Sequence, residues 1–134
     1  MRAVYESLLQ GLAQALQLDP LTLLASGALR LGGVDFRLQL NALPDEAVLL
    51  LLCRFGPLPA MPPDQTHAAV CRLLQTNLQL VDGAMCSFFA LDESGAEVVY
   101  CVRMLLLDCT VDELLACLRV CAQEASAWHC GASA

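Results

Sequence analysis

The chain has 134 residues, a hydrophobic fraction of 57% and a net charge of −7, from 14 acidic residues against 7 arginines. This balance argues against binding nucleic acid or an anionic membrane surface, because both need clustered cations. The hydrophobic fraction lies above the usual roughly 45–50%, and a small domain cannot bury all of it. We therefore expect some apolar surface to contact another chain.

The sequence predicts a cytoplasmic protein. Its longest apolar run, residues 47–53, is far shorter than the roughly 20 residues that span a membrane. The first residues form an amphipathic stretch and do not resemble the apolar region of a signal peptide. In the reducing cytosol, we expect the 8 cysteines to be mostly free thiols.

The first predicted element is an amphipathic helix over residues 4–18. Apolar side chains recur there at helical spacing, with glutamine and glutamate on the other faces. Asp19-Pro20 ends the helix, since the residue before a proline is pushed away from helical geometry. Residues 21–24 fit either a short apolar turn or a lead into a sheet.

Three strands are predicted next. Residues 28–31 and 34–40 indicate a hairpin around Gly32-Gly33, because apolar and polar residues alternate through the second arm. Residues 47–55 begin with the longest apolar run and predict a central strand covered on both faces. A connector over residues 56–63, with four prolines, follows this strand.

The second half predicts a helix, a hairpin and a last helix. Residues 64–80 form the helix, with Asp64 as its N-cap. Residues 84–91 and 96–107 are the hairpin arms, rich in β-branched and aromatic residues. Thr110 and Glu113 match a capping box, which starts a helix that runs to about residue 128.

Together these elements predict one α+β domain over residues 1–134. The expected order is α-β-β-β-α-β-β-α. The architecture is a single-layer, twisted, mostly antiparallel sheet of about five strands with three helices packed on it.

No catalytic, metal-binding or cofactor-binding constellation is predicted. The cysteines contain no C-x-x-C pair, and Cys117 and Cys121 on the last helix do not match a known zinc spacing. His67 and His129 are the only histidines available to activate a thiol. Adjacent acidic pairs lie at turns or at a helix start, where solvated or capping carboxylates are common. We predict buried thiols that behave as small hydrophobic side chains, and no enzyme.

Several segments, taken in order, resemble one family, the class I chaperones of bacterial type III secretion, or CesT (Tir chaperone) family. They are RFGPLP at 54–59, LLQTN at 73–77, FALD to GAEVV at 89–99, and AW at 127–128. The resemblance extends over nearly the whole chain, and the size and acidity also fit.

The resemblance implies a cytoplasmic homodimer without catalytic activity and without a cofactor. Its partners would be the N-terminal segments of one or a few secreted effectors, held in a non-globular state. The secretion ATPase or sorting platform is a further candidate partner. Two alternatives remain open: a thiol-redox or small-ligand-binding dimer of a related fold, and an adaptor that binds a component of the secretion apparatus.

In this family the first helix and the first three strands usually contribute client grooves, and the middle helix with the strands next to it usually forms the dimer interface. The candidate client-binding residues are accordingly Leu8, Leu12, Leu16, Val34, Phe36, Leu38 and Leu40. The same side chains also fit a plain core beneath a helix. The candidate dimer residues are Val70, Leu73, Leu74, Asn77, Met85 and Phe88.

Overall fold

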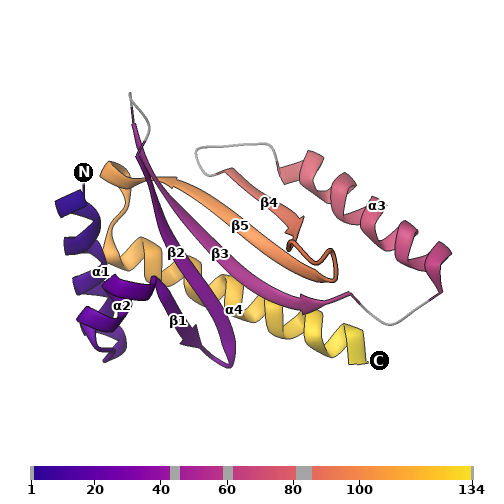
Figure 1. The fold of residues 1–134 in the computed structure, drawn as a ribbon, viewed down its shortest axis with the longest axis horizontal. Coiled ribbons are helices and arrows are strands. Elements are labelled where there is room, and N and C mark those ends of the chain that lie inside the picture. The colour runs from indigo at the N-terminus through magenta and orange to yellow at the C-terminus, as the bar shows by residue number, and fades with distance from the viewer. Residues whose placement is uncertain (1, 43–45, 59–61, 81–85, 134) are drawn as a thin grey trace.

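A five-stranded antiparallel sheet forms the centre of the fold, with the strand order β1-β2-β3-β5-β4 (Figure 1). The computed structural model describes residues 2–42, 46–58, 62–80 and 86–133. The predicted α+β class and antiparallel sheet are confirmed. The strands are β1 (Ala28–Leu31), β2 (Val34–Ala42), β3 (Ala47–Pro57), β4 (Cys86–Leu91) and β5 (Glu97–Leu105). The helices are α1 (Arg2–Leu16), α2 (Pro20–Ser26), α3 (Pro63–Leu80), α4 (Val111–Ser133) and the short 3-10 helix η1 (Leu106–Asp108).

The α-helices described number four, one more than the sequence predicts. α2 occupies the segment for which the sequence allows a turn or a lead into the sheet. Pro20 stands at its start, where the missing N–H costs nothing, and Gly27 ends it with φ 67°. This helix makes only about two turns, so a stripe with a period of 3.6 residues cannot be recognised in it.

One face of the sheet carries α1, α2 and α4, and α4 lies across the central strand β3 (Figure 1). Side chains alternate between the two faces of a strand. In the β2–β3 register Phe36 pairs with Cys53 and Leu38 with Leu51, and all four side chains are buried beneath the helices. The core is therefore the layer between this face and the helices.

The prediction that β3 is covered on both faces is wrong for most of its length. Leu49, Leu51 and Cys53 are buried on the helix side, whereas Leu50 and Leu52 on the opposite face are only half-buried. We call that opposite face the outer face. A continuous apolar run in β3 thus supplies both core and accessible apolar surface.

α1 and α4 approach each other closely at a glycine. A Cβ atom added to Gly11 would lie 2.7 Å from Cγ2 of Val111, closer than such atoms normally approach. The absent side chain therefore lets α1 pack against the beginning of α4.

We expect Gly11→Ala to yield little or no gain in stability, although alanine favours a helix over glycine by about 1 kcal/mol. The added Cβ must displace Val111, which offsets that gain. In a Val111→Ala background, Gly11→Ala should stabilise the fold by about 1 kcal/mol. Urea unfolding at one fixed protein concentration measures both effects. Equal effects in the two backgrounds would contradict the close contact.

Candidate functional site

Most of the candidate client-binding residues lie in the core, which is the alternative that the sequence left open for them. Five of the seven side chains are at most 7% exposed and belong to the core: Leu8, Leu12, Val34, Phe36 and Leu38. Leu16 and Leu40 are half-buried and pack against the same core. The reason is the position of α1, whose Tyr5 Oη donates a hydrogen bond to the Leu38 carbonyl at 3.3 Å. These apolar rows pack against each other in the core.

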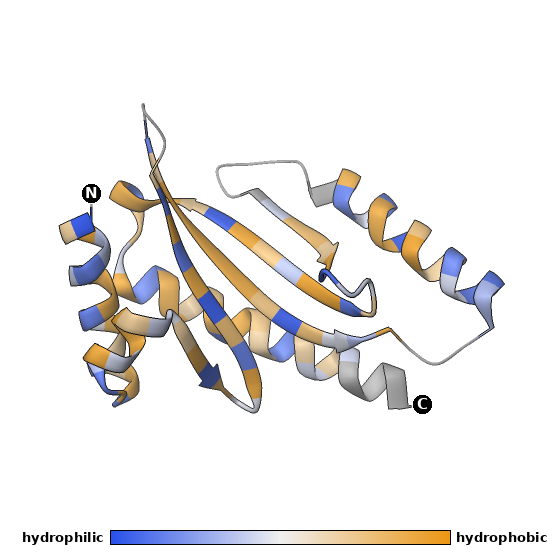
Figure 2. Cartoon of the chain, in the orientation of Figure 1, coloured by the Kyte–Doolittle hydropathy of each residue, from blue (hydrophilic) through white to orange (hydrophobic). Residues whose placement is uncertain are grey.

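The candidate dimer residues lie on α3 and β4, and several are accessible. Leu74 is 62% exposed and Phe88 is 37% exposed, while Val70 and Leu73 are half-buried. Met85 lies outside the described residues. Leu78, which is 79% exposed and one turn after Leu74, is not among the candidate dimer residues. We call Leu74 and Leu78 the α3 stripe; Figure 2 shows hydrophobic positions along this helix.

Asn77 fastens α3 to the edge of the sheet. Its Nδ2 donates a hydrogen bond to the Phe89 carbonyl at 2.9 Å, and its Oδ1 accepts one from the Phe89 N–H at 2.5 Å. The side-chain amide thus pairs with β4 as a neighbouring strand would. Asn77 therefore occupies part of the β4 edge and fixes the orientation in which α3 presents its stripe.

The other edge of the sheet is β1. The Leu38 N–H donates to the Gly27 carbonyl at 2.7 Å, which extends the β1–β2 register. Because hydrogen-bonded and non-hydrogen-bonded pairs alternate, the backbone groups of Ala28 and Arg30 point away from β2. The Ala28 N–H is bonded to Ser26 Oγ at 3.1 Å. Arg30 therefore directs its N–H and C=O to the outside of the sheet.

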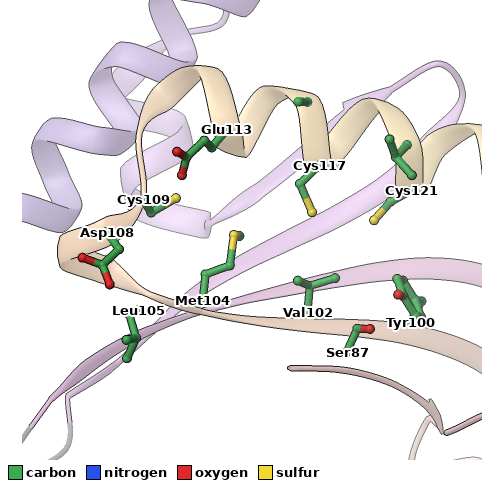
Figure 3. A pocket seen from close by; sticks show the side chains of 12 residues that line it. Ser87, Tyr100, Val102, Met104, Leu105, Asp108, Cys109, Glu113, Cys117 and Cys121 are labelled. Carbon is green, nitrogen blue, oxygen red and sulfur yellow. The ribbon is translucent and has the colours of Figure 1, made fainter. Parts of the chain in front are cut away.

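An apolar pocket lies between the β4–β5 half of the sheet and α4, on the same side as the core (Figure 3). Its volume is about 560 Å³. The strands contribute the floor and α4 contributes a wall, with two carboxylates at the end next to η1. The lining residues are Ser87, Tyr100, Val102, Met104, Leu105, Asp108, Cys109, Glu113, Ala116, Cys117, Val120 and Cys121.

Three cysteines line this pocket, and their surroundings make them poor nucleophiles. Burial, with Glu113 and Cys117 nearby, raises the pKa of Cys109 to about 11. The contact with Cys121, together with burial, raises the pKa of Cys117. Hydrogen bonding with Cys117 lowers the pKa of Cys121, but the contact with Cys53 and burial raise it to about 12 overall. The reactive species is the thiolate, so thiols protonated at neutral pH favour packing over chemistry.

The described residues contain no group of three or more histidine, cysteine or acidic side chains placed to hold a metal ion. On α3, Cys71 Sγ lies 3.6 Å from His67 Nε2, a pair that the sequence analysis does not single out. Two such ligands are fewer than the four of a structural zinc site. Within the described part of the chain, no helix has the length and apolarity to cross a membrane.

The pocket is the main feature that the sequence analysis misses, although part of its signal is visible. Tyr100, Val102 and Met104 alternate along one strand, so they share a face. Glu113, Cys117 and Cys121 are spaced by four residues on a helix, so they share a flank. The sequence contains both patterns but does not show that the two surfaces face each other across an unfilled gap.

Comparison with known proteins identifies the class of protein that this fold defines. Residues 7–129 match the Tir chaperone protein (CesT) family, and the chain belongs to that family. No curated protein matches the sequence. Among solved structures, a similar fold is that of SycH, a Yersinia pestis type III secretion chaperone crystallised with a stable fragment of YscM2. The TM-score is 0.64 at 19% identity, over 92% of this chain and 98% of that chain. Family and fold are those of a type III secretion chaperone.

We expect Asn77→Ala to destabilise the protein by about 1–3 kcal/mol, because the Phe89 N–H and C=O lose their partners in a partly buried place. Asn77→Asp should cost more, since a carboxylate cannot donate to the carbonyl and repels it. Urea unfolding measures both variants, with Gln75→Ala, an exposed neighbour on α3, as the control. If Asn77→Ala matched that control, the hydrogen bonds to Phe89 would contribute nothing to stability.

Proposed function

We propose that this protein is a homodimeric chaperone that binds the N-terminal segment of a type III secreted effector in the bacterial cytoplasm. The proposal includes no catalytic activity and no cofactor. Family membership supports the class, and SycH, crystallised with a fragment of YscM2, supports the binding of another protein chain. The raised pKa values of the buried thiols favour this proposal over a thiol-redox protein.

The observation that carries the proposal is the apolar surface around α3. The α3 stripe is exposed, and Phe88 on the outer face of β4 is partly exposed. On the same face, one strand further away across β5, Leu50 and Leu52 of β3 are half-buried. Fully burying one leucine side chain contributes about 1.5–3 kcal/mol. A two-fold interface uses the same patch on both subunits. A dimer formed through α3 would therefore bury two copies of the α3 stripe, one from each subunit.

The hydrogen bonds of Asn77 make this surface suitable for a dimer. Two hydrogen bonds to Phe89 hold α3 against β4 before any partner arrives. A helix whose position is already fixed loses little conformational freedom on association. More of the free energy gained by burying apolar surface therefore contributes to affinity. We propose that α3 and the outer face next to it form the dimer interface.

For the client, we propose strand addition at β1. An extended peptide that adds to a sheet edge forms backbone hydrogen bonds and needs no particular side chains, which suits a non-globular client. The outward N–H and C=O of Arg30 are the groups that would pair with it. β4 is less suitable, because Asn77 already occupies the N–H and C=O of Phe89.

The first experiment is capture of partners by the tagged protein from its own host, with mass spectrometry and light scattering of the complexes. The proposal expects one or a few secreted proteins, held through their N-terminal regions by a dimer. The secretion ATPase or sorting platform is a further proposed partner. Tight capture of an apparatus component, with no secretable client, would instead identify an adaptor. A protein that carries no partner would contradict the proposal.

Leu74→Asp and Leu78→Asp are each expected to weaken the dimer by at least about tenfold in dissociation constant. Each change removes apolar burial and places a charge in the interface on both subunits. Size-exclusion chromatography with light scattering over a dilution series measures this. Leu21→Asp is the matched control, because Leu21 is also highly exposed but lies on α2. A soluble dimer with unchanged affinity in both α3 variants would overturn the interface.

Arg30→Pro should weaken binding of the captured client by about tenfold or more, because proline removes the outward N–H of β1. Arg30→Ala should bind the client nearly normally, since it keeps the backbone and loses only an exposed ion pair with Asp35 and an exposed hydrogen bond to the Gly33 carbonyl. Titration of the labelled client segment measures both, and thermal unfolding checks that each variant is folded. Equal affinities for the two variants would show that the client does not pair with β1.

A further inference from the structure

We propose that the pocket between β5 and α4 binds a second part of the client, an amphipathic segment with apolar side chains next to a lysine or arginine. This inference rests on the proposed client-binding function. It adds a contact far from β1, at the opposite half of the sheet, and it specifies the chemistry of the segment.

The lining shows what the pocket accepts. Val102 and Met104 form an apolar floor, Val120 stands on the helix side, and Cys109, Cys117 and Cys121 add small apolar surface. Ligand pockets typically have volumes of roughly 300–1,000 Å³, and this one has about 560 Å³. The space therefore exceeds that of one side chain and fits several apolar side chains from one turn of an amphipathic helix.

Charge selects between possible occupants. Asp108 and Glu113 lie together at the η1 end of the pocket (Figure 3). No lysine or arginine is among the lining residues that the structure describes. A cation placed beside the apolar side chains of the occupant would meet these two carboxylates next to a low-dielectric wall, where attraction is stronger than in open water. An acidic segment with the same apolar side chains would be repelled.

The pocket also stays accessible in the proposed dimer. Ser87 lines the pocket, and its neighbour Phe88 points to the other face of the sheet, since consecutive strand residues alternate. The α3 stripe and Phe88 belong to the proposed dimer interface, whereas the pocket faces α4. Val120 at the pocket is 57% exposed. A second copy bound through α3 would therefore leave this apolar lining for the client.

The test uses two synthetic peptides as probes against the full-length protein. Both have about 15 residues and leucines at positions i, i+3, i+4 and i+7, which favours an amphipathic helix. One carries arginines on the flanks of the apolar face and the other carries glutamates at the same positions. Fluorescence anisotropy should show the arginine peptide binding at least about tenfold more tightly.

Pocket variants locate the binding. Ala116→Arg places a cation at the pocket, one turn from Glu113, and should weaken the arginine peptide by about tenfold. Ser126→Arg adds the same charge at an exposed position of α4 outside the lining and should have much less effect. Asp108→Asn with Glu113→Gln should remove most of the preference for arginine. Glu93→Gln with Asp112→Asn, exposed and outside the lining, makes the same charge change as a control.

Three results with the peptides and the pocket variants would overturn the proposal. Equal affinity for both peptides would show that the pocket does not distinguish a basic segment from an acidic one. Equal effects of Ala116→Arg and Ser126→Arg would place the peptide elsewhere. A change in dimer affinity caused by Ala116→Arg would assign the pocket to contact between subunits. The captured client separates this proposal from the general function: if the client binds wild-type protein and Ala116→Arg equally well, the pocket assignment fails alone. If no client is captured, the function fails, whatever the peptides show.

Discussion

The packing of α4 across β3 is the contact on which the rest of the structure depends. β3 is the middle strand of the sheet and pairs with β2 on one side and β5 on the other. α4 covers β3 between the β1–β2 hairpin and the β4–β5 hairpin. Two of its own side chains, Leu114 and Leu118, are fully buried against the sheet. α1 then packs against α4 at Gly11 and contributes Leu9 and Leu12 to the core. The β5–β4 side receives only the flank of α4, and the pocket is the space that remains.

The two edge strands of the sheet, β4 and β1, differ in whether a neighbour occupies their outward backbone groups. β4 has a neighbour, α3, whose Asn77 takes the N–H and C=O of Phe89. β1 ends the sheet with its outward backbone groups directed away from β2. An unpaired edge invites strand addition, which proteins usually suppress. For the strand addition that we propose, the open edge at β1 defines where a client would pair, and the occupied edge at β4 is protected.

The cysteines illustrate how composition alone can mislead about chemistry. Eight thiols in 134 residues invite a redox or metal function. Cys53 and Cys121 are buried in the core, where they pack as small hydrophobic side chains. Their partners are one another and a backbone carbonyl, with Cys53 Sγ 3.8 Å from the Cys121 carbonyl oxygen. Small apolar side chains are what this narrow layer between α4 and β3 requires.

The sequence by itself determined the class of fold, the order of its main elements and the family, because periods of 2 and 3.6 residues are local properties. It also indicated excess apolar surface and a role for α3, through Leu74 and Asn77. Only the tertiary structure decided which apolar rows are core and which are accessible. Leu38 alternates with polar neighbours as in any half-buried strand, and its burial depends on α1, whose Tyr5 is 33 residues away in the sequence. Likewise Met104 and Cys117 line one pocket because α4 crosses β3 at a particular angle, and no local pattern encodes where two distant surfaces meet without filling the space between them.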